Sequence, residues 1–110
     1  MTEILSEKHC LACEGGIPAL DKEQIKKMMF EVPKWNLNES GTELSRSFDF
    51  KNYYHTMAFV NAVAWIAHQE NHHPDLEVSY NRLHIRYSTH AVNGVTENDL
   101  ICAAKIDKII

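Results

Sequence analysis

The sequence has little of what marks secreted, membrane-spanning or nucleic-acid-binding proteins. No apolar run approaches the about 20 residues of a membrane span, and the first residues lack the charged-then-apolar pattern of a signal peptide. Only three of the 110 residues are cysteines, and so small and odd a number argues against a disulfide framework. The formal net charge of −4 predicts no basic surface for nucleic acid. We therefore expect a cytoplasmic protein that binds neither membranes nor nucleic acids.

What the sequence does contain is typical of one globular domain. A chain of 110 residues can bury roughly two thirds of its unfolded surface, and 45% hydrophobic with 24% charged residues is an ordinary composition. Residues 1–19, which include Cys10 and Cys13, are expected to form a flexible N-terminal tail. Residues 20–110 are expected to form a single domain without internal repeats.

Three helices are predicted, and each begins at a residue that can cap it. Asp21, Asn52 and Thr96 are of the types preferred at the N-cap. The middle helix is apolar nearly all round between residues 57 and 67, which predicts that it is the central element of the core. The expected spans are residues 21–30, 52–71 and 96–109.

Alternating apolar and polar residues predict two β-hairpins between the helices. In residues 43–50 every odd position is polar and most even positions are apolar, as in a half-buried antiparallel strand. Residues 35–38 pair with that strand, and residues 76–80 and 83–87 form the second hairpin. The predicted fold class is α+β, a four-stranded antiparallel sheet with helices packed on one face, in the order α-β-β-α-β-β-α. The open face would carry Ser45, Ser47, Glu77, Ser79, His84, Arg86 and Ser88.

Three histidines lie where predicted elements end. His72 and His73 close the middle helix before Pro74, and His90 follows the last predicted strand. Because an antiparallel hairpin returns the chain toward its start, His90 is expected at the level of the other two. The unperturbed pKa of histidine, about 6.5, allows proton exchange near neutral pH. Two or three converging imidazoles can therefore supply an acid and a base without any cofactor.

The residues alone also leave a metal site open. His68 and His72 are four residues apart, and with His90 they would suit a histidine-ligated metal-binding protein or hydrolase. The pattern lacks the adjacent glutamate that serves as the general base in such hydrolases. Cys10 and Cys13 are half of a zinc site, but no second CxxC pair exists, which favours free thiols.

Several residues along the chain form an ordered set: His72-His73-Pro74, Tyr80, Ser88-Thr89-His90 and Asp99, with Trp35-Asn36 before the first strand. Over about residues 20–110 this set resembles the pterin-4a-carbinolamine dehydratase family. The resemblance implies a dehydratase that converts 4a-hydroxytetrahydropterin to quinonoid dihydropterin and water, with no metal and no other cofactor. It also implies a link to an aromatic amino acid hydroxylase, whose tetrahydropterin is recycled in this way.

The resemblance further implies a role for each residue of the set. His72 and His90 would be the acid/base pair, in an order that stays open, and His73 would orient the pterin. Asp99 would orient a histidine or stabilise its protonated form, although Thr96 and Asp99 also match a capping box that needs no catalytic role. Trp35 would be an aromatic wall of the site or a core residue. The implied substrate-binding set is Trp35, His72, His73, Pro74, Ser88, Thr89, His90, Ala91 and Val92.

Two positions depart from the family pattern. His68 stands where many members have an acidic residue, and Asn98 stands where many have a basic one. Neither change removes a proposed acid or base. Both change the charge around the site.

Self-association is predicted from the last helix and the sheet. Most positions after Asp99 are apolar, more than the single stripe that packs on a sheet, and at least one strand edge must be covered. Symmetric homo-oligomers solve both problems, and the resemblance implies a dimer or a tetramer. Because animal members also bind a transcription factor, a non-catalytic dimerisation or transcription cofactor is the alternative function.

Overall fold

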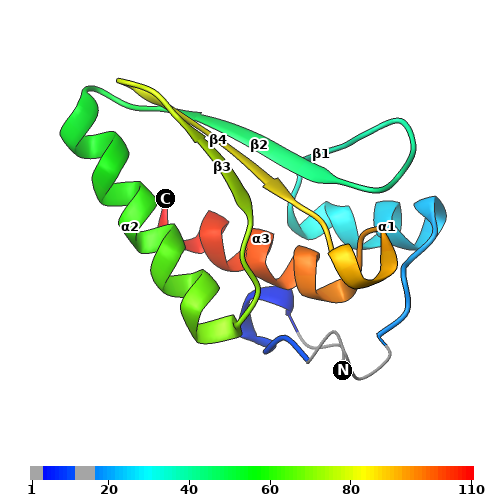
Figure 1. The fold of residues 1–110 in the computed structure, drawn as a ribbon. Coiled ribbons are helices and arrows are strands. Elements are labelled where there is room, and N and C mark those ends of the chain that lie inside the picture. The colour runs from blue at the N-terminus through cyan, green and yellow to red at the C-terminus, as the bar shows by residue number, and fades with distance from the viewer. Residues whose placement is uncertain (1–3, 12–16) are drawn as a thin grey trace.

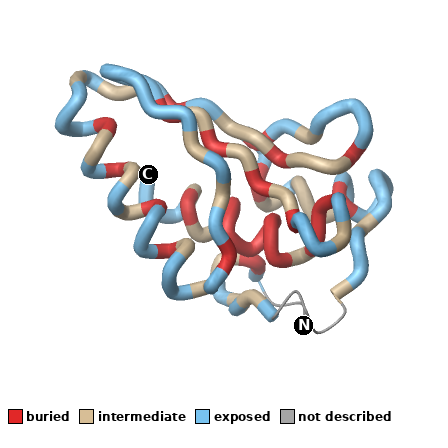
Figure 2. The backbone as a smooth tube through the Cα atoms, in the orientation of Figure 1, coloured by how far each residue is buried: buried red, intermediate tan, exposed pale blue. Residues whose placement is uncertain are grey.

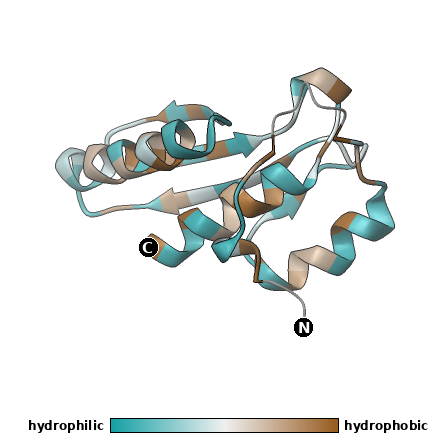
Figure 3. Cartoon of the chain, turned by 90° about the horizontal axis from the view of Figure 1, so that it is seen from below, coloured by the Kyte–Doolittle hydropathy of each residue, from teal (hydrophilic) through white to brown (hydrophobic). Residues whose placement is uncertain are grey.

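A computed structural model describes residues 4–11 and 17–110, so Cys13 lies outside the described residues. Within these described ranges, one antiparallel sheet forms a layer, and three helices cover a single face of it (Figure 1). No described helix is long and apolar enough to cross a membrane, and hydrophilic residues interrupt all three (Figure 3). The predicted fold class is confirmed.

The sheet has four strands in the order β1-β2-β4-β3, and all neighbours are antiparallel. The central strands β2 and β4 pair buried residues, with Leu44 opposite Tyr87 and Phe48 opposite Leu83. Alternation therefore places one apolar face toward the helices. The strand bounds are β1 Asn36–Leu37, β2 Leu44–Asp49, β3 Asp75–Val78 and β4 Arg82–Tyr87.

The helices begin where their capping residues predict. The side chains of Asp21, Asn52 and Thr96 accept hydrogen bonds from backbone N–H groups of the first turn, which satisfies donors that the helix itself leaves unpaired. Short 3₁₀ turns add to the predicted order. The bounds are α1 Lys22–Met28, α2 Tyr53–Glu70 and α3 Glu97–Ile109, with the 3₁₀ turns η1 Leu5–Glu7, η3 Met29–Glu31 and η4 His90–Val92.

The central helix is α3, and the prediction that the middle helix fills the core is wrong. In α2 only one stripe is buried, and Tyr54 and Trp65 are 79% and 59% exposed. In α3 every residue from Asn98 to Ala104 is buried, as is Ile106 (Figure 2). The sequence of α2 is the more apolar of the two. However, α3 lies between α2, the sheet and the N-terminal segment, whereas α2 has one covered side.

The N-terminal segment, residues 4–11, packs against α3 instead of forming the expected flexible tail. Leu5 is 2% exposed, and its N–H donates to Glu31 Oε1 at 3.0 Å. The Lys105 ammonium donates to the Ser6 carbonyl at 3.1 Å. The surplus apolar surface of α3 is therefore covered from within the chain, which removes the reason to place α3 in an interface between subunits.

We predict that the N-terminal segment contributes to stability through Leu5. The Leu5→Ala variant should lose about 2–5 kcal/mol of unfolding free energy, the usual cost of truncating a buried leucine. Urea unfolding of the variant and the parent measures this loss. Leu11→Ala is the matched control, because Leu11 is 71% exposed and should change stability by less than about 0.5 kcal/mol. Equal effects of the two changes would contradict the packing of this segment.

Candidate active site

The end of α2 directs two neighbouring histidines to opposite sides. Asn71 adopts the left-handed conformation with φ 51° and ends the helix, and the His72 N–H donates to the Ala67 carbonyl at 3.1 Å. Pro74 prevents the helix from continuing. The His72 side chain consequently points inward and is 8% exposed, whereas His73 is exposed.

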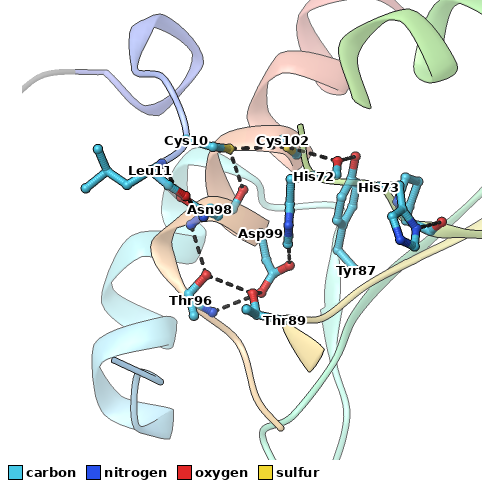
Figure 4. Close-up of polar contacts among 11 residues, drawn as sticks. Cys10, Leu11, His72, His73, Tyr87, Thr89, Thr96, Asn98, Asp99 and Cys102 are labelled. Atoms are coloured by element: carbon cyan, nitrogen blue, oxygen red, sulfur yellow. Dashed lines mark hydrogen bonds and ion pairs between the residues drawn. The ribbon is translucent and has the colours of Figure 1, made fainter. Parts of the chain in front are cut away.

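His72 meets a buried carboxylate at the start of α3. Its Nε2 lies 2.6 Å from Asp99 Oδ1, and Asp99 is fully buried (Figure 4). The second oxygen, Oδ2, accepts from the Thr89 hydroxyl at 2.8 Å and from the Thr96 N–H at 2.9 Å. Asp99 is therefore both a capping-box residue of α3 and the hydrogen-bond partner of His72. The two interpretations of Asp99 from the sequence are compatible.

The His72–Asp99 pair decides the protonation of the imidazole. Burial lowers the pKa of His72, but the hydrogen bond and the negative charge of Asp99 raise it, and the net shift is upward. The imidazole therefore holds its proton at higher pH than a free histidine does.

Tyr87 covers one face of the His72 ring. The two rings stack with their centroids 5.5 Å apart and an interplanar angle of 20°. The Tyr87 hydroxyl donates to the His72 carbonyl at 3.4 Å. Burial, foremost, raises the pKa of Tyr87, so this side chain stays neutral. Strand alternation predicts that Tyr87 lies on the apolar face of β4. It does not predict the contact with His72, because alternation says nothing about which side chain a residue meets.

The ring that faces His90 is that of His73. Their centroids are 6.4 Å apart with a tilt of 33°, and both side chains are exposed. His90 leaves β4 through the 3₁₀ turn η4, which the left-handed Asn93 closes. The structure thus brings all three histidines to one end of the sheet, with His73 beside His90 and His72 behind them on Asp99.

A cavity of about 320 Å³ lies beside His90. Ligand sites of about 300 Å³ and above hold small molecules. Ser88, Thr89 and His90 line it, together with Asn38, Thr42 and Glu43 from the turn between β1 and β2. These three residues were missed, because a turn between strands carries no sign of which distant loop it approaches.

The other predicted binding residues lie in different surroundings. Trp35 is 3% exposed, its Nε1–H donates to Asp107 at 2.7 Å, and its ring packs against Tyr87, so the structure supports the core interpretation. Pro74 and Val92 are half-buried and Ala91 is exposed.

The two positions that depart from the family pattern are not part of the His72–Asp99 pair. His68 is exposed on α2, with its ring 5.6 Å from that of Trp65. Asn98 is buried and binds the N-terminal segment, since its amide accepts from the Leu11 N–H at 3.0 Å and donates to the Leu11 carbonyl at 2.7 Å.

The metal alternative gains no support from the geometry. Within residues 4–11 and 17–110, no group of three or more histidine, cysteine, aspartate or glutamate side chains is placed to hold a metal ion. His68, His72 and His90 all belong to these ranges, so they do not converge as a ligand set.

The fold and the site together define a small α+β domain with three histidines at one end of its sheet and a cavity beside one of them, His90. The sequence profile of the family described as pterin 4 alpha carbinolamine dehydratase matches residues 18–109. The chain belongs to this family, whose members are hydro-lyases. The resemblance seen in the sequence is confirmed.

Relatives match the chain from end to end. A protein of Legionella pneumophila (strain Lens), provisionally named a pterin-4-alpha-carbinolamine dehydratase, is 58% identical over 100% of this chain and 98% of its own length. One of Nitrosomonas eutropha, named in the same way, is 50% identical over the same shares.

Solved structures share the fold. The crystal structure of a transcriptional coactivator/pterin dehydratase from Brucella melitensis superposes with a TM-score of 0.78 at 30% identity, over 83% of this chain and 97% of that one. A pterin dehydratase-like protein identified as a RuBisCO assembly factor has a TM-score of 0.60 at 22% identity, over 69% and 88% of the two chains, and shows the fold alone.

We predict that stability depends on pH through the His72–Asp99 pair. The folded pKa of His72 is raised, so the contribution of its charge is complete below the unfolded value of about 6.5 and is lost as pH rises through the folded value. The His72→Gln variant keeps a hydrogen-bond donor for Asp99 but removes the positive charge of the imidazolium. It should cost about 1.5–3 kcal/mol at about pH 6, the range of a hydrogen bond to a charged group, and less at higher pH. Urea unfolding across this range measures the difference.

The control for this measurement is His55→Gln, at an exposed position on α2. Its difference from the parent protein should be small and should not vary with pH. A His72→Gln difference that stays constant or grows as pH rises would contradict a proton held by Asp99.

Proposed function

We propose that the protein dehydrates 4a-hydroxytetrahydropterin to quinonoid dihydropterin and water by histidine acid/base catalysis. The observation that carries the proposal is the convergence of His72, His73 and His90 at one sheet end, with Asp99 buried behind them. Membership of the family and the names of its relatives support the same reaction. The reaction moves protons and a hydroxyl group only, which matches a site rich in imidazole.

Two proton transfers are needed, and we assign them to His72 and His90. The 4a-hydroxyl leaves as water once a general acid protonates it, and a general base removes the proton from N5 of the ring. His72 suits the acid, because Asp99 raises its pKa. His90 suits the base, because it is exposed and lines the cavity. Each such group typically contributes about 10²–10⁴-fold to the rate.

The neighbouring residues would hold the substrate and the acid in place. His73 is exposed beside His90, so it would contact the pterin and orient it. Thr89 and Ser88 line the cavity, and Ala91 and Val92 follow in the same turn with backbone groups for the amide-like edge of the pterin. Asp99 is a positioning residue, because it acts through His72 and is itself fully buried.

We further propose that the protein serves an aromatic amino acid hydroxylase. Such an enzyme releases its spent cofactor as the 4a-hydroxytetrahydropterin, and the dehydrated product is the form that can be reduced for another turnover. Hydroxylase turnover with limiting tetrahydropterin, with and without this protein, tests the link.

We predict that changes at the two proton-transfer residues mainly lower kcat, whereas a change at the binding residue mainly raises KM. His72→Gln and His90→Ala should each slow dehydration at least about tenfold, since each removes a proton-transfer group. His73→Ala should raise KM more than it lowers kcat. Stopped-flow decay of enzymatically generated 4a-hydroxytetrahydropterin measures all three. Asp99→Asn should move the alkaline limb of the kcat profile to lower pH, because the charge that holds the His72 proton is lost.

His84→Ala is the matched control, since His84 pairs with Ser47 on the open face of the sheet at 2.6 Å. It should leave kcat and KM unchanged. Normal kcat in His72→Gln together with a large loss in His73→Ala would transfer the acid role to His73. Absence of any dehydration in the parent protein would favour a non-catalytic cofactor.

We also propose that the protein is a homo-oligomer, a dimer or a tetramer. The exposed apolar side chains of α2 include Tyr54 and Trp65, and those at and beyond β3 include Val78 and Tyr80. β3 is the last strand of the sheet and pairs on one side only, so its other edge can accept a strand. These two surfaces replace the last helix as the proposed interface.

Light scattering at micromolar concentration should give at least twice the chain mass of 12.7 kDa. Tyr54→Lys should lower the mass by placing a charge in the proposed interface. Phe30→Lys is the matched control, because Phe30 is equally exposed, at 76%, but lies in η3 away from α2. A monomeric parent protein would contradict self-association, and equal effects of the two changes would contradict the interface.

A further inference from the structure

Two thiols from opposite ends of the chain meet where the N-terminal segment packs against α3. The sulfurs of Cys10 and Cys102 are 3.6 Å apart although the two residues lie 92 positions apart in the sequence (Figure 4). Cys102 is fully buried, whereas Cys10 is half-buried. A disulfide brings two sulfurs to about 2.05 Å, so a small closing movement would join them.

The backbone around Cys10 is held where this closure needs it. The Cys10 N–H donates to Glu70 Oε1 at 2.7 Å, and the paired hydrogen bonds between Leu11 and Asn98 fix the next residue. The Cys10 thiol also lies 3.6 Å from the Asn98 carbonyl. Residues from α2 and α3 thus clamp the segment on both sides of the sulfur pair.

We propose that Cys10 and Cys102 form a reversible disulfide on oxidation, which joins the N-terminal segment covalently to α3. A hydroperoxide is the oxidant. The Cys10 sulfur attacks its O–O bond, which gives a sulfenic acid on Cys10 and releases an alcohol or water. The Cys102 sulfur then attacks the Cys10 sulfur, the S–O bond breaks and water leaves. Two thiols lose two protons and two electrons, and the hydroperoxide takes up both electrons.

The two cysteines suit different halves of this reaction. Cys10 is the thiol that a hydroperoxide can reach, because Cys102 is fully buried. Cys102 suits the second step, since the hydrogen bond from the Cys10 thiol lowers its pKa, against burial and with help from the charge of His72. The hydrogen bond to Cys102 raises the pKa of Cys10, so the first step should be slow and should need excess hydroperoxide.

The disulfide would lie next to the candidate active site without using its groups. Cys102 follows Asp99 by one helical turn, and its sulfur is 4.0 Å from the His72 carbonyl. The cross-link would close a loop of 92 residues. Closing a long loop restricts the unfolded chain, so the oxidised protein should resist unfolding more than the reduced one.

Peptide mapping after treatment with hydrogen peroxide tests the pairing. Trypsin leaves Cys10 and Cys13 together in residues 9–22 and leaves Cys102 in residues 87–105. The Cys13→Ser variant therefore isolates the proposed pair. Its two peptides should become linked, with the loss of two hydrogens, and should separate on reduction. The urea midpoint of this variant should rise on oxidation and return on reduction.

The matched variant is Cys10→Ser, at a half-buried position that tolerates serine. It should show no link between residues 9–22 and 87–105 and no rise in the urea midpoint. An equal yield of that link in Cys10→Ser would overturn the assignment to Cys10. Oxidation of Cys10 beyond sulfenic acid without a link, or a link between two chains on a non-reducing gel, would overturn the intramolecular disulfide.

Discussion

The buried carboxylate of Asp99 is the group on which the histidine-bearing end of the sheet depends. A charge without solvent is costly unless hydrogen bonds and a partner charge surround it. Here the partners come from three separate elements: His72 after α2, Thr89 after β4, and the Thr96 N–H at the start of α3. One carboxylate thereby fixes where three chain segments end relative to one another. It also has a local role, because it completes the capping box of α3.

The exposed site is a consequence of that buried network. His73 follows His72, and His90 follows Thr89, so each exposed imidazole is attached to a residue that Asp99 holds from inside. The centroids of these two exposed rings lie 6.4 Å apart. The pair that holds the His72 proton therefore lies in the interior, and the imidazoles of His73 and His90 lie at the surface.

The two long helices show why apolar content alone misleads. Both α2 and α3 are rich in apolar residues, and the apolar middle of α2 predicts that this helix fills the core. The structure buries α3 instead, because the sheet lies over it and the N-terminal segment covers its far side through Leu5. The apolar residues of α2 outside its buried stripe are left exposed, Trp65 among them. Three exposed large apolar side chains, Tyr53, Tyr54 and Trp65, therefore lie on the helix that the sequence placed innermost.

Local patterns determined a large part of this protein. Capping residues at Asp21, Asn52 and Thr96 set the helix starts, strand alternation set the face of the sheet, and an ordered set of residues identified the family. These signals are readable because they depend on neighbours within a few positions. Only the tertiary structure decided which helix is central, that His73 lies beside His90 with Asp99 holding His72, and that Cys10 meets Cys102 across 92 residues. Periodicity shows that a face will be covered, but the identity of the covering segment depends on how the whole chain packs.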